Sequence, residues 1–192
     1  MSQPAAHALL RAGPIVALAG RRIDAPGAAK PRFPAANTQQ VMERIREILS
    51  TREASALVSS AACGADLLGL EAATERAMRR RVILPFPREI FRSTSVVDRP
   101  GEWGAQYDRI LDEVEGTGDL VVLGYRDSDD KAYIATNEAI LNEALSLGKA
   151  WERRVIALVV WDRQSRGADD ITEHFLNEAA RRGIQAHEVF TI

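Results

Sequence analysis

Two runs of small and basic residues stand where phosphate-binding chemistry is expected. Gly20 is followed by Arg21 and Arg22, so a backbone without a Cβ can approach an anion that two guanidinium groups neutralise. The run from Ser59 to Asp66 is made of small residues and enters a predicted helix, where backbone N–H groups can hold a phosphate. Both runs predict an anion site. The alternatives are a solvated basic turn for the first run and close packing of a helix on a sheet for the second.

Carboxylates and a phenol ring near these runs could contact the sugar and base of a nucleotide. Asp66 could cap its helix or bind a ribose hydroxyl, and the candidate catalytic carboxylates are Asp66, Glu71 and Asp24. Asp66 and Glu71 are five residues apart, which on a helix separates their directions by roughly 140°, so only Asp66 is expected in the site. Tyr133 and Asn137 are four residues apart on one helical face, where both can hydrogen-bond a ligand.

The other candidate residues lie at junctions between predicted strands and helices. Ligands of open α/β sheets bind outside the carboxyl ends of the strands. Phe86 offers an aromatic wall after the third strand, although buried phenylalanine is usually part of a core. Asp169 or Asp170 is explained as the N-cap of the last helix. The full set of expected ligand-binding residues is Gly20, Arg21, Arg22, Asp24, Arg32, Ser60, Gly64, Asp66, Phe86, Tyr133, Asn137, Asp162, Gly167 and Thr172.

The candidate residues are positioned by predicted strands and helices, since short β-branched runs alternate with amphipathic segments along the chain. The pattern predicts an α/β fold, a Rossmann-like, doubly wound and mostly parallel six-stranded sheet with helices on both faces and strands buried on both sides. The expected strands are Ile15–Ala19, Ala56–Ser59, Arg81–Pro85, Leu120–Gly124, Val155–Trp161 and Gln185–Phe190. The expected helices are Thr38–Thr51, Ala65–Arg80, Glu102–Val114, Ala132–Leu147 and Asp170–Arg182.

The connection Arg21–Asn37 is long for a strand-to-helix loop. Its prolines and its phenylalanine predict an ordered, functional segment. Residues 1–14 are expected to be a flexible N-terminus without the features of a signal peptide, and residues 15–192 to form one domain.

The composition narrows the classes of partner. The chain has 192 residues, a formal net charge of −2 and one cysteine, Cys63. The balanced charge disfavours a dedicated nucleic-acid or membrane coat, and a lone cysteine fits a reducing cytoplasm. Cys63 has no obvious partner to activate it as a nucleophile. No apolar run is long enough to span a bilayer.

Together these junctions resemble the SLOG superfamily, Rossmann-like domains named for the DNA-processing Smf proteins and the LOG phosphoribohydrolases, over nearly the whole chain. Gly20-Arg21-Arg22 resembles the Gly-x-Arg turn of that family. The helix entry matches the family's Ser-Gly-x-Ala-x-Gly-x-Asp motif at Ser59, Ala62, Gly64 and Asp66, Arg32-Phe33-Pro34 resembles a loop of signalling-associated bacterial members, and Asn137 matches an asparagine of several branches.

The resemblance implies binding or sensing of a nucleotide or nucleotide-derived, ADP-ribose-like ligand. The alternative is a nucleotide N-glycosidase, a LOG-like nucleoside monophosphate phosphoribohydrolase. Against it, acids replace glycines of the LOG motif between Gly167 and Thr172, and Phe175 stands in place of the motif's glutamate. Smf-like binding of single-stranded DNA is disfavoured by the charge. No metal site or cofactor is assigned; a divalent cation accompanying a phosphate and a homo-oligomer are left open.

Overall fold

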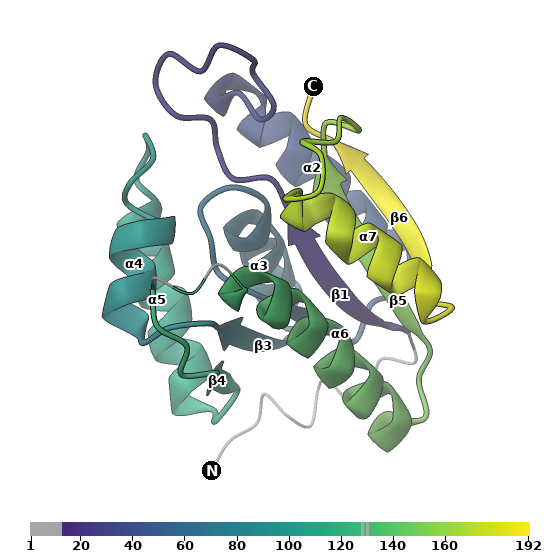
Figure 1. The fold of residues 1–192 in the computed structure, drawn as a ribbon. Helices are drawn as coiled ribbons and strands as arrows, with labels where there is room; N and C mark the ends of the chain where they lie inside the picture. The colour runs from purple at the N-terminus through teal and green to yellow at the C-terminus, as the bar shows by residue number, and fades with distance from the viewer. Residues whose placement is uncertain (1–12, 128, 130) are drawn as a thin grey trace.

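The six strands found among the described residues run parallel in one sheet, in the order β4-β3-β2-β1-β5-β6 (Figure 1). The computed structural model describes residues 13–192 except 128 and 130. The expected flexible N-terminus, 1–14, lies outside the described residues except for its last two positions. The predicted α/β class, with a Rossmann-like parallel sheet, is therefore confirmed.

The elements follow the predicted alternation of strand and helix. The strands are β1 (Ile15–Gly20), β2 (Ala56–Ser59), β3 (Arg79–Leu84), β4 (Leu120–Val122), β5 (Val155–Trp161) and β6 (Gln185–Phe190). The helices are the short 3-10 helix η1 (Ala35–Asn37), α2 (Thr38–Thr51), α3 (Ala65–Glu75), α4 (Arg88–Ser95), α5 (Trp103–Gly116), α6 (Ala132–Trp151) and α7 (Ile171–Arg181).

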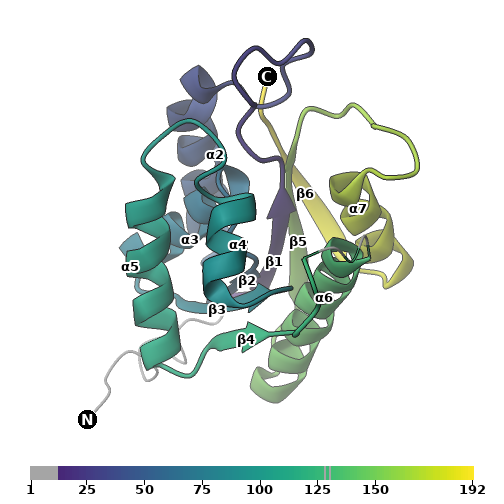
Figure 2. The same ribbon diagram turned by 60° about the vertical axis from the view of Figure 1, so that its left-hand side comes forward.

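Alternating side chains of the strands feed two cores, one on each face of the sheet. Val16 and Leu18 of β1 pack into the core under α2, α3, α4 and α5, whereas Ile15 and Ala17 pack into the core under α6 and α7. Figure 2 shows the two groups of helices on opposite sides of the sheet. A strand covered by helices on both faces has no water-facing side, which explains why the β1 and β2 sequences are apolar except for Ser59 at the end of β2.

Three expectations about individual elements are wrong. The helix expected to run to Arg80 ends at Glu75, where Ala77 takes a positive φ of 50° and β3 begins at Arg79. Helix α4 is missing from the expected helices, because its polar sequence contains few of the apolar positions that mark a buried face. The edge strands β4 and β6 are not buried on both sides, since helices cover them only in part; Gln185 is exposed.

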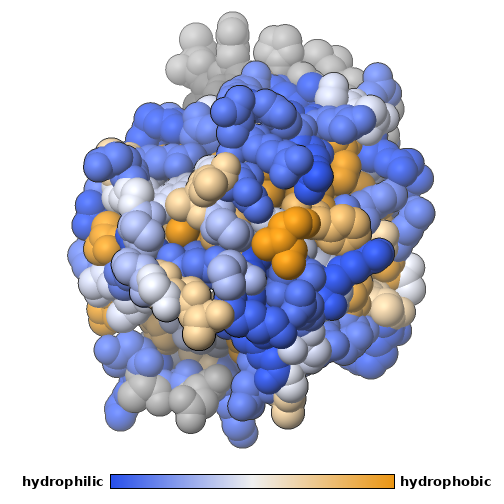
Figure 3. Space-filling model, turned by 90° about the horizontal axis from the view of Figure 1, so that it is seen from above, coloured by the Kyte–Doolittle hydropathy of each residue, from blue (hydrophilic) through white to orange (hydrophobic). Residues whose placement is uncertain are grey.

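The face from which the C-terminus emerges is largely hydrophilic. Seen from above, its apolar side chains form small separate patches (Figure 3). Within the described part of the chain, no helix combines the length and apolar character needed to cross a membrane.

Candidate functional site

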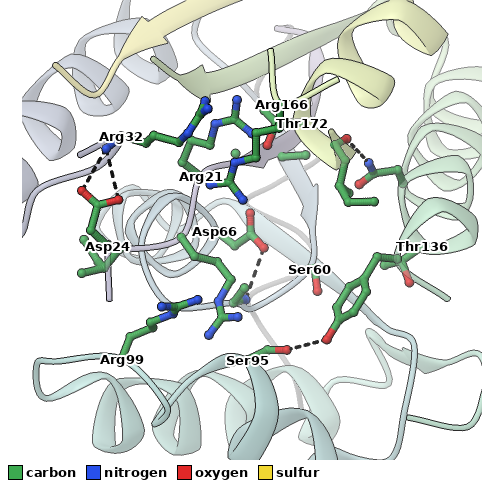
Figure 4. A pocket seen from close by; sticks show the side chains of 18 of the residues that line it. Arg21, Asp24, Arg32, Ser60, Asp66, Ser95, Arg99, Thr136, Arg166 and Thr172 are labelled. Carbon is green, nitrogen blue, oxygen red and sulfur yellow. Dashed lines mark hydrogen bonds between the residues drawn. The ribbon is translucent and has the colours of Figure 1, made fainter. Parts of the chain in front are cut away.

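A cavity of about 440 Å³ lies beyond the carboxyl ends of β1 and β2, against α6 and the loop after β5 (Figure 4). The sheet order explains its position. The chain proceeds from β1 to β4 on one side of β1, then returns through α6 to place β5 on the other side. The connections on the two sides of β1 diverge at this point and leave a crevice, which is the usual ligand position in open α/β sheets.

Two glycines bring the first strand and the third helix together. A Cβ at Gly20 would meet the Ala65 Cβ and the Val160 carbonyl oxygen at 2.5 Å each. Gly64 has a φ of +98°, and a Cβ there would lie 2.8 Å from the Arg21 carbonyl oxygen. The Ala65 N–H donates to that same Arg21 oxygen at 3.1 Å. The Gly20–Arg22 turn and the helix entry are therefore in direct contact.

Arg21 is held in a buried charge cluster, with its side chain only 3% exposed. Its guanidinium donates to both carboxylate oxygens of Asp170 at 2.7 Å, to Asp162 at 3.0 Å and to the Gln164 carbonyl at 2.8 Å. Arg32 donates to Asp162 and to the same carbonyl. Burial alone would raise the pKa of Asp170, but hydrogen bonds from Arg21 and from two backbone N–H groups lower it to about 2. We call these four charged residues the buried cluster; its two arginines are matched by two carboxylates.

The long loop 21–37 is fastened at its base and to the end of the chain. The Asp24 carboxylate accepts hydrogen bonds from the backbone N–H groups of Arg32 (2.9 Å) and Phe33 (3.0 Å). Asn37 donates to the Thr191 carbonyl at 2.8 Å, and the Thr191 hydroxyl donates to the Arg32 carbonyl. Asp24 therefore lines the cavity while serving as the internal brace of the loop.

Arg22 has a different partner from Arg21 and shares that carboxylate with a second arginine. Its guanidinium pairs with Asp98, and Arg99 Nε lies 3.6 Å from the other oxygen of Asp98. One carboxylate thus serves two cations. The Nε atoms of both arginines are buried and have no hydrogen-bond partner among the described residues. We call Arg22 and Arg99 the open pair.

Ser60 and Asp66 lie deep in the cavity (Figure 4). Ser60 is only 9% exposed, and its hydroxyl has no hydrogen-bond partner within the described residues. Asp66 is 7% exposed and accepts from the Ala62 N–H at 3.2 Å. Burial raises the pKa of Asp66 to about 7, against the opposing effects of that hydrogen bond and of the Arg22 charge. Asp66 therefore stands near the midpoint between its neutral and ionised forms at neutral pH.

Helix α6 contributes the neutral wall of the cavity. Tyr133 and Asn137 both line it, as their spacing predicts. The Tyr133 hydroxyl bonds to that of Ser95 at 3.0 Å, and Asn137 Nδ2 donates to the Ile171 carbonyl at 2.7 Å. Thr172 lines the cavity from α7, but its N–H is taken by the N-cap Asp170.

Several expected site residues do not line the cavity. Phe86 is 1% exposed and packs edge-on against the Tyr133 ring in the core, because the chain after β3 turns inward into α4. Both carboxylate oxygens of Asp162 accept hydrogen bonds within the buried cluster, from Arg21 and Arg32. Gly64 and Gly167 shape the backbone at φ of +98° and +91° without facing the cavity. Glu71 points away from the cavity and pairs with Arg109 of α5.

Three cationic side chains that line the cavity are absent from the expected set: Arg99, Arg166 and Lys30. Lys30 and Arg166 lie in connections that leave β1 and β5, so the rule about strand ends could have identified them. Arg99 follows the unpredicted helix α4, and nothing in the sequence marks it. Partial desolvation and the charges of Arg21 and Arg32 lower the pKa of Arg166, which indicates positive charge that is incompletely compensated.

The described residues contain no group of three or more His, Cys, Asp or Glu side chains arranged to hold a metal ion. Cys63 is fully buried in the core, and burial raises the pKa of its thiol. A raised pKa leaves little thiolate, the reactive form, so the thiol is expected to be a poor nucleophile.

The fold and the cavity define an α/β protein with a Rossmann-like parallel sheet and a site at its switch point. No protein-family model and no curated protein matches the chain. Among solved structures, DNA processing protein A (DprA) from Streptococcus pneumoniae is similar, with 14% identity and a TM-score of 0.40 over 94% of this chain. The chain spans 60% of the length of that protein. At this level of similarity neither the ligand nor the activity of this chain follows from it.

Proposed function

We propose that the cavity binds a nucleotide or a nucleotide-derived ligand, a class that includes ADP-ribose-like molecules. The observation that carries the proposal is the set of buried polar groups without acceptors: Ser60 Oγ, Arg22 Nε and Arg99 Nε belong to residues that line one cavity. Buried donors are ordinarily hydrogen-bonded, so their deficit favours a ligand rich in acceptor oxygens. A phosphate supplies such oxygens to arginine.

The volume and the uncharged lining of the cavity suit the sugar and the base of a nucleotide. A volume of about 440 Å³ falls within the range of small-molecule sites. Tyr133, Thr136 and Asn137 offer a ring, a hydroxyl and an amide along one helix, which suit a sugar and a base. The motifs that resemble the SLOG superfamily, Gly20-Arg21-Arg22 and Ser59 to Asp66, meet at this cavity and agree with the proposal.

Calorimetric titration of the purified protein with AMP, adenosine and inorganic phosphate tests the proposal, with and without Mg²⁺. We expect AMP to bind more tightly than adenosine, and Ser60→Ala and Arg99→Gln to weaken AMP by roughly ten- to a hundredfold, the range for losing hydrogen bonds to a charged group. Arg109→Gln is the matched control, because Arg109 pairs with Glu71 away from the cavity. If AMP and other nucleoside monophosphates fail to bind at millimolar concentration, the proposal is wrong.

The second candidate function is hydrolysis of an N-glycosidic bond. The observation in its favour is Asp66, a buried carboxyl with a pKa of about 7 inside the cavity, which is the property of a general acid. Phe175, in the position of the LOG glutamate, is fully buried core. We expect no free base when nucleoside monophosphates or NAD are incubated with the protein and the products are separated by chromatography. Turnover that disappears in Asp66→Asn would favour the enzyme instead.

A further inference from the structure

The cations that line the cavity fall into two groups with Asp66 between them. Arg99 lies on one side of Asp66, and Arg32 and Arg166 lie on the other (Figure 4). The first group is the open pair, where Arg22 and Arg99 share the carboxylate of Asp98. The second group contains Arg32 and Arg166, and Lys30 lines the same cavity from the loop 21–37.

Each group keeps positive charge beyond what its carboxylates neutralise. At the open pair, two guanidinium groups face one carboxylate, and each keeps a buried Nε–H without an acceptor. In the second group, the buried cluster matches Arg21 and Arg32 with Asp162 and Asp170, so Arg166 remains as the additional cation next to it. Asp169 also lines this side and reduces the excess, which makes the second group the weaker of the two.

The two groups have different charged neighbours: Arg22 and Arg99 lie against Asp98, whereas Arg166 lies near Arg21, Arg32, Asp162 and Asp170. We therefore treat them as two anion-binding positions. Two arginines are well suited to clamp one phosphate by paired hydrogen bonds. The uncharged side chains of Tyr133 and Asn137 on α6 line the same cavity and can contact the sugar or the base of the ligand.

We propose that the cavity takes a nucleotide with two separated anionic groups, one bound by Arg22 and Arg99 and the other by Arg166 with Lys30. This inference rests on the proposed function and adds the charge arrangement of the ligand. Asp66 then lies beside the neutral middle of the ligand, where a hydroxyl group can donate to its carboxylate. A ligand with one terminal phosphate uses the open pair and leaves the second group hydrated.

The experiment compares AMP with adenosine 3′,5′-bisphosphate in calorimetric titrations at low ionic strength. We expect the bisphosphate to bind at least about ten times more tightly than AMP, since the second phosphate gains charge-assisted hydrogen bonds. Arg166→Gln is expected to reduce the affinity for the bisphosphate to nearly that for AMP and to leave AMP almost unchanged. Arg99→Gln is expected to weaken both ligands, and Arg109→Gln neither.

The outcomes distinguish this inference from the proposed function. Equal affinity for AMP and the bisphosphate, with Arg166→Gln neutral toward both, overturns the two-anion ligand and leaves nucleotide binding standing. Absence of binding by either ligand overturns the proposed function itself. Arg166 is exposed and has no role in the core, so its variant keeps the fold, which circular dichroism checks.

Discussion

Arg21 and Arg22 are neighbours in the sequence, yet they end in opposite surroundings. Arg21 is 3% exposed and fully matched by Asp162 and Asp170, whereas Arg22 shares Asp98 with Arg99 and keeps an unpaired Nε. The buried cluster joins two loops, and all three guanidinium nitrogen atoms of Arg21 donate to acceptors within them. The open pair is partly exposed and keeps two buried Nε–H groups without an acceptor among the described residues. Under the proposed function, hydrogen-bond partners distinguish Arg21, which has a structural role, from Arg22, which we propose to bind the ligand, although both residues line the cavity.

The largest expected difference between the two regions is in stability. Arg21→Ala leaves two buried carboxylates without a cation and should lower the free energy of unfolding by about 3–5 kcal/mol. Arg22→Ala breaks a partly exposed pair and should lower it by about 1 kcal/mol or less. Urea unfolding followed by circular dichroism measures both. Equal destabilisation by the two variants would erase the distinction between the buried cluster and the open pair.

The next effect concerns Asp66, which lies between the two regions. Its pKa rises from 3.8 to about 7 on folding, so between these pH values the unfolded chain releases a proton that the folded chain retains. The contribution of this group is fully present below about pH 4 and is lost as the pH rises to about 7, by at most about 4 kcal/mol. Urea midpoints at pH 4 to 8 should show this decline in the wild type relative to Asp66→Asn. Parallel profiles for the two proteins would place the Asp66 pKa near its ordinary value.

The smallest effect is expected outside both regions, at Glu71. Its ion pair with Arg109 is partly exposed, with side chains 27% and 45% accessible. Glu71→Gln should change the free energy of unfolding by less than about 1 kcal/mol and leave AMP affinity unchanged. A loss of AMP affinity in this variant, measured by calorimetry, would return Glu71 to the site.

The sequence predicted the strands well because buried parallel strands are continuous apolar runs, and β2 and β5 match their expected limits residue for residue. It also brought Gly20, Ser60, Asp66, Tyr133 and Asn137 to one cavity, through the rule that ligands bind at strand ends. It could not separate Arg21 from Arg22, since their partners are distant in the chain. Nor could it place Arg99, whose position depends on α4, a helix with too few apolar residues to be recognised.

The order in which the chain is made bears on the cavity. Arg21 finds its partners 141 and 149 residues later, and the Thr191 hydroxyl reaches the Arg32 carbonyl across 159 residues. During synthesis β1, β2 and β3 can pair early. The second edge of β1 stays unpaired until β5 has been made, and the contacts of the loop 21–37 with Thr191 form later still. A nascent chain stopped before β5 therefore has four of the six described strands but lacks Asp162 and Asp170, so the cavity as the structure shows it can be completed only after the later part of the chain has been made.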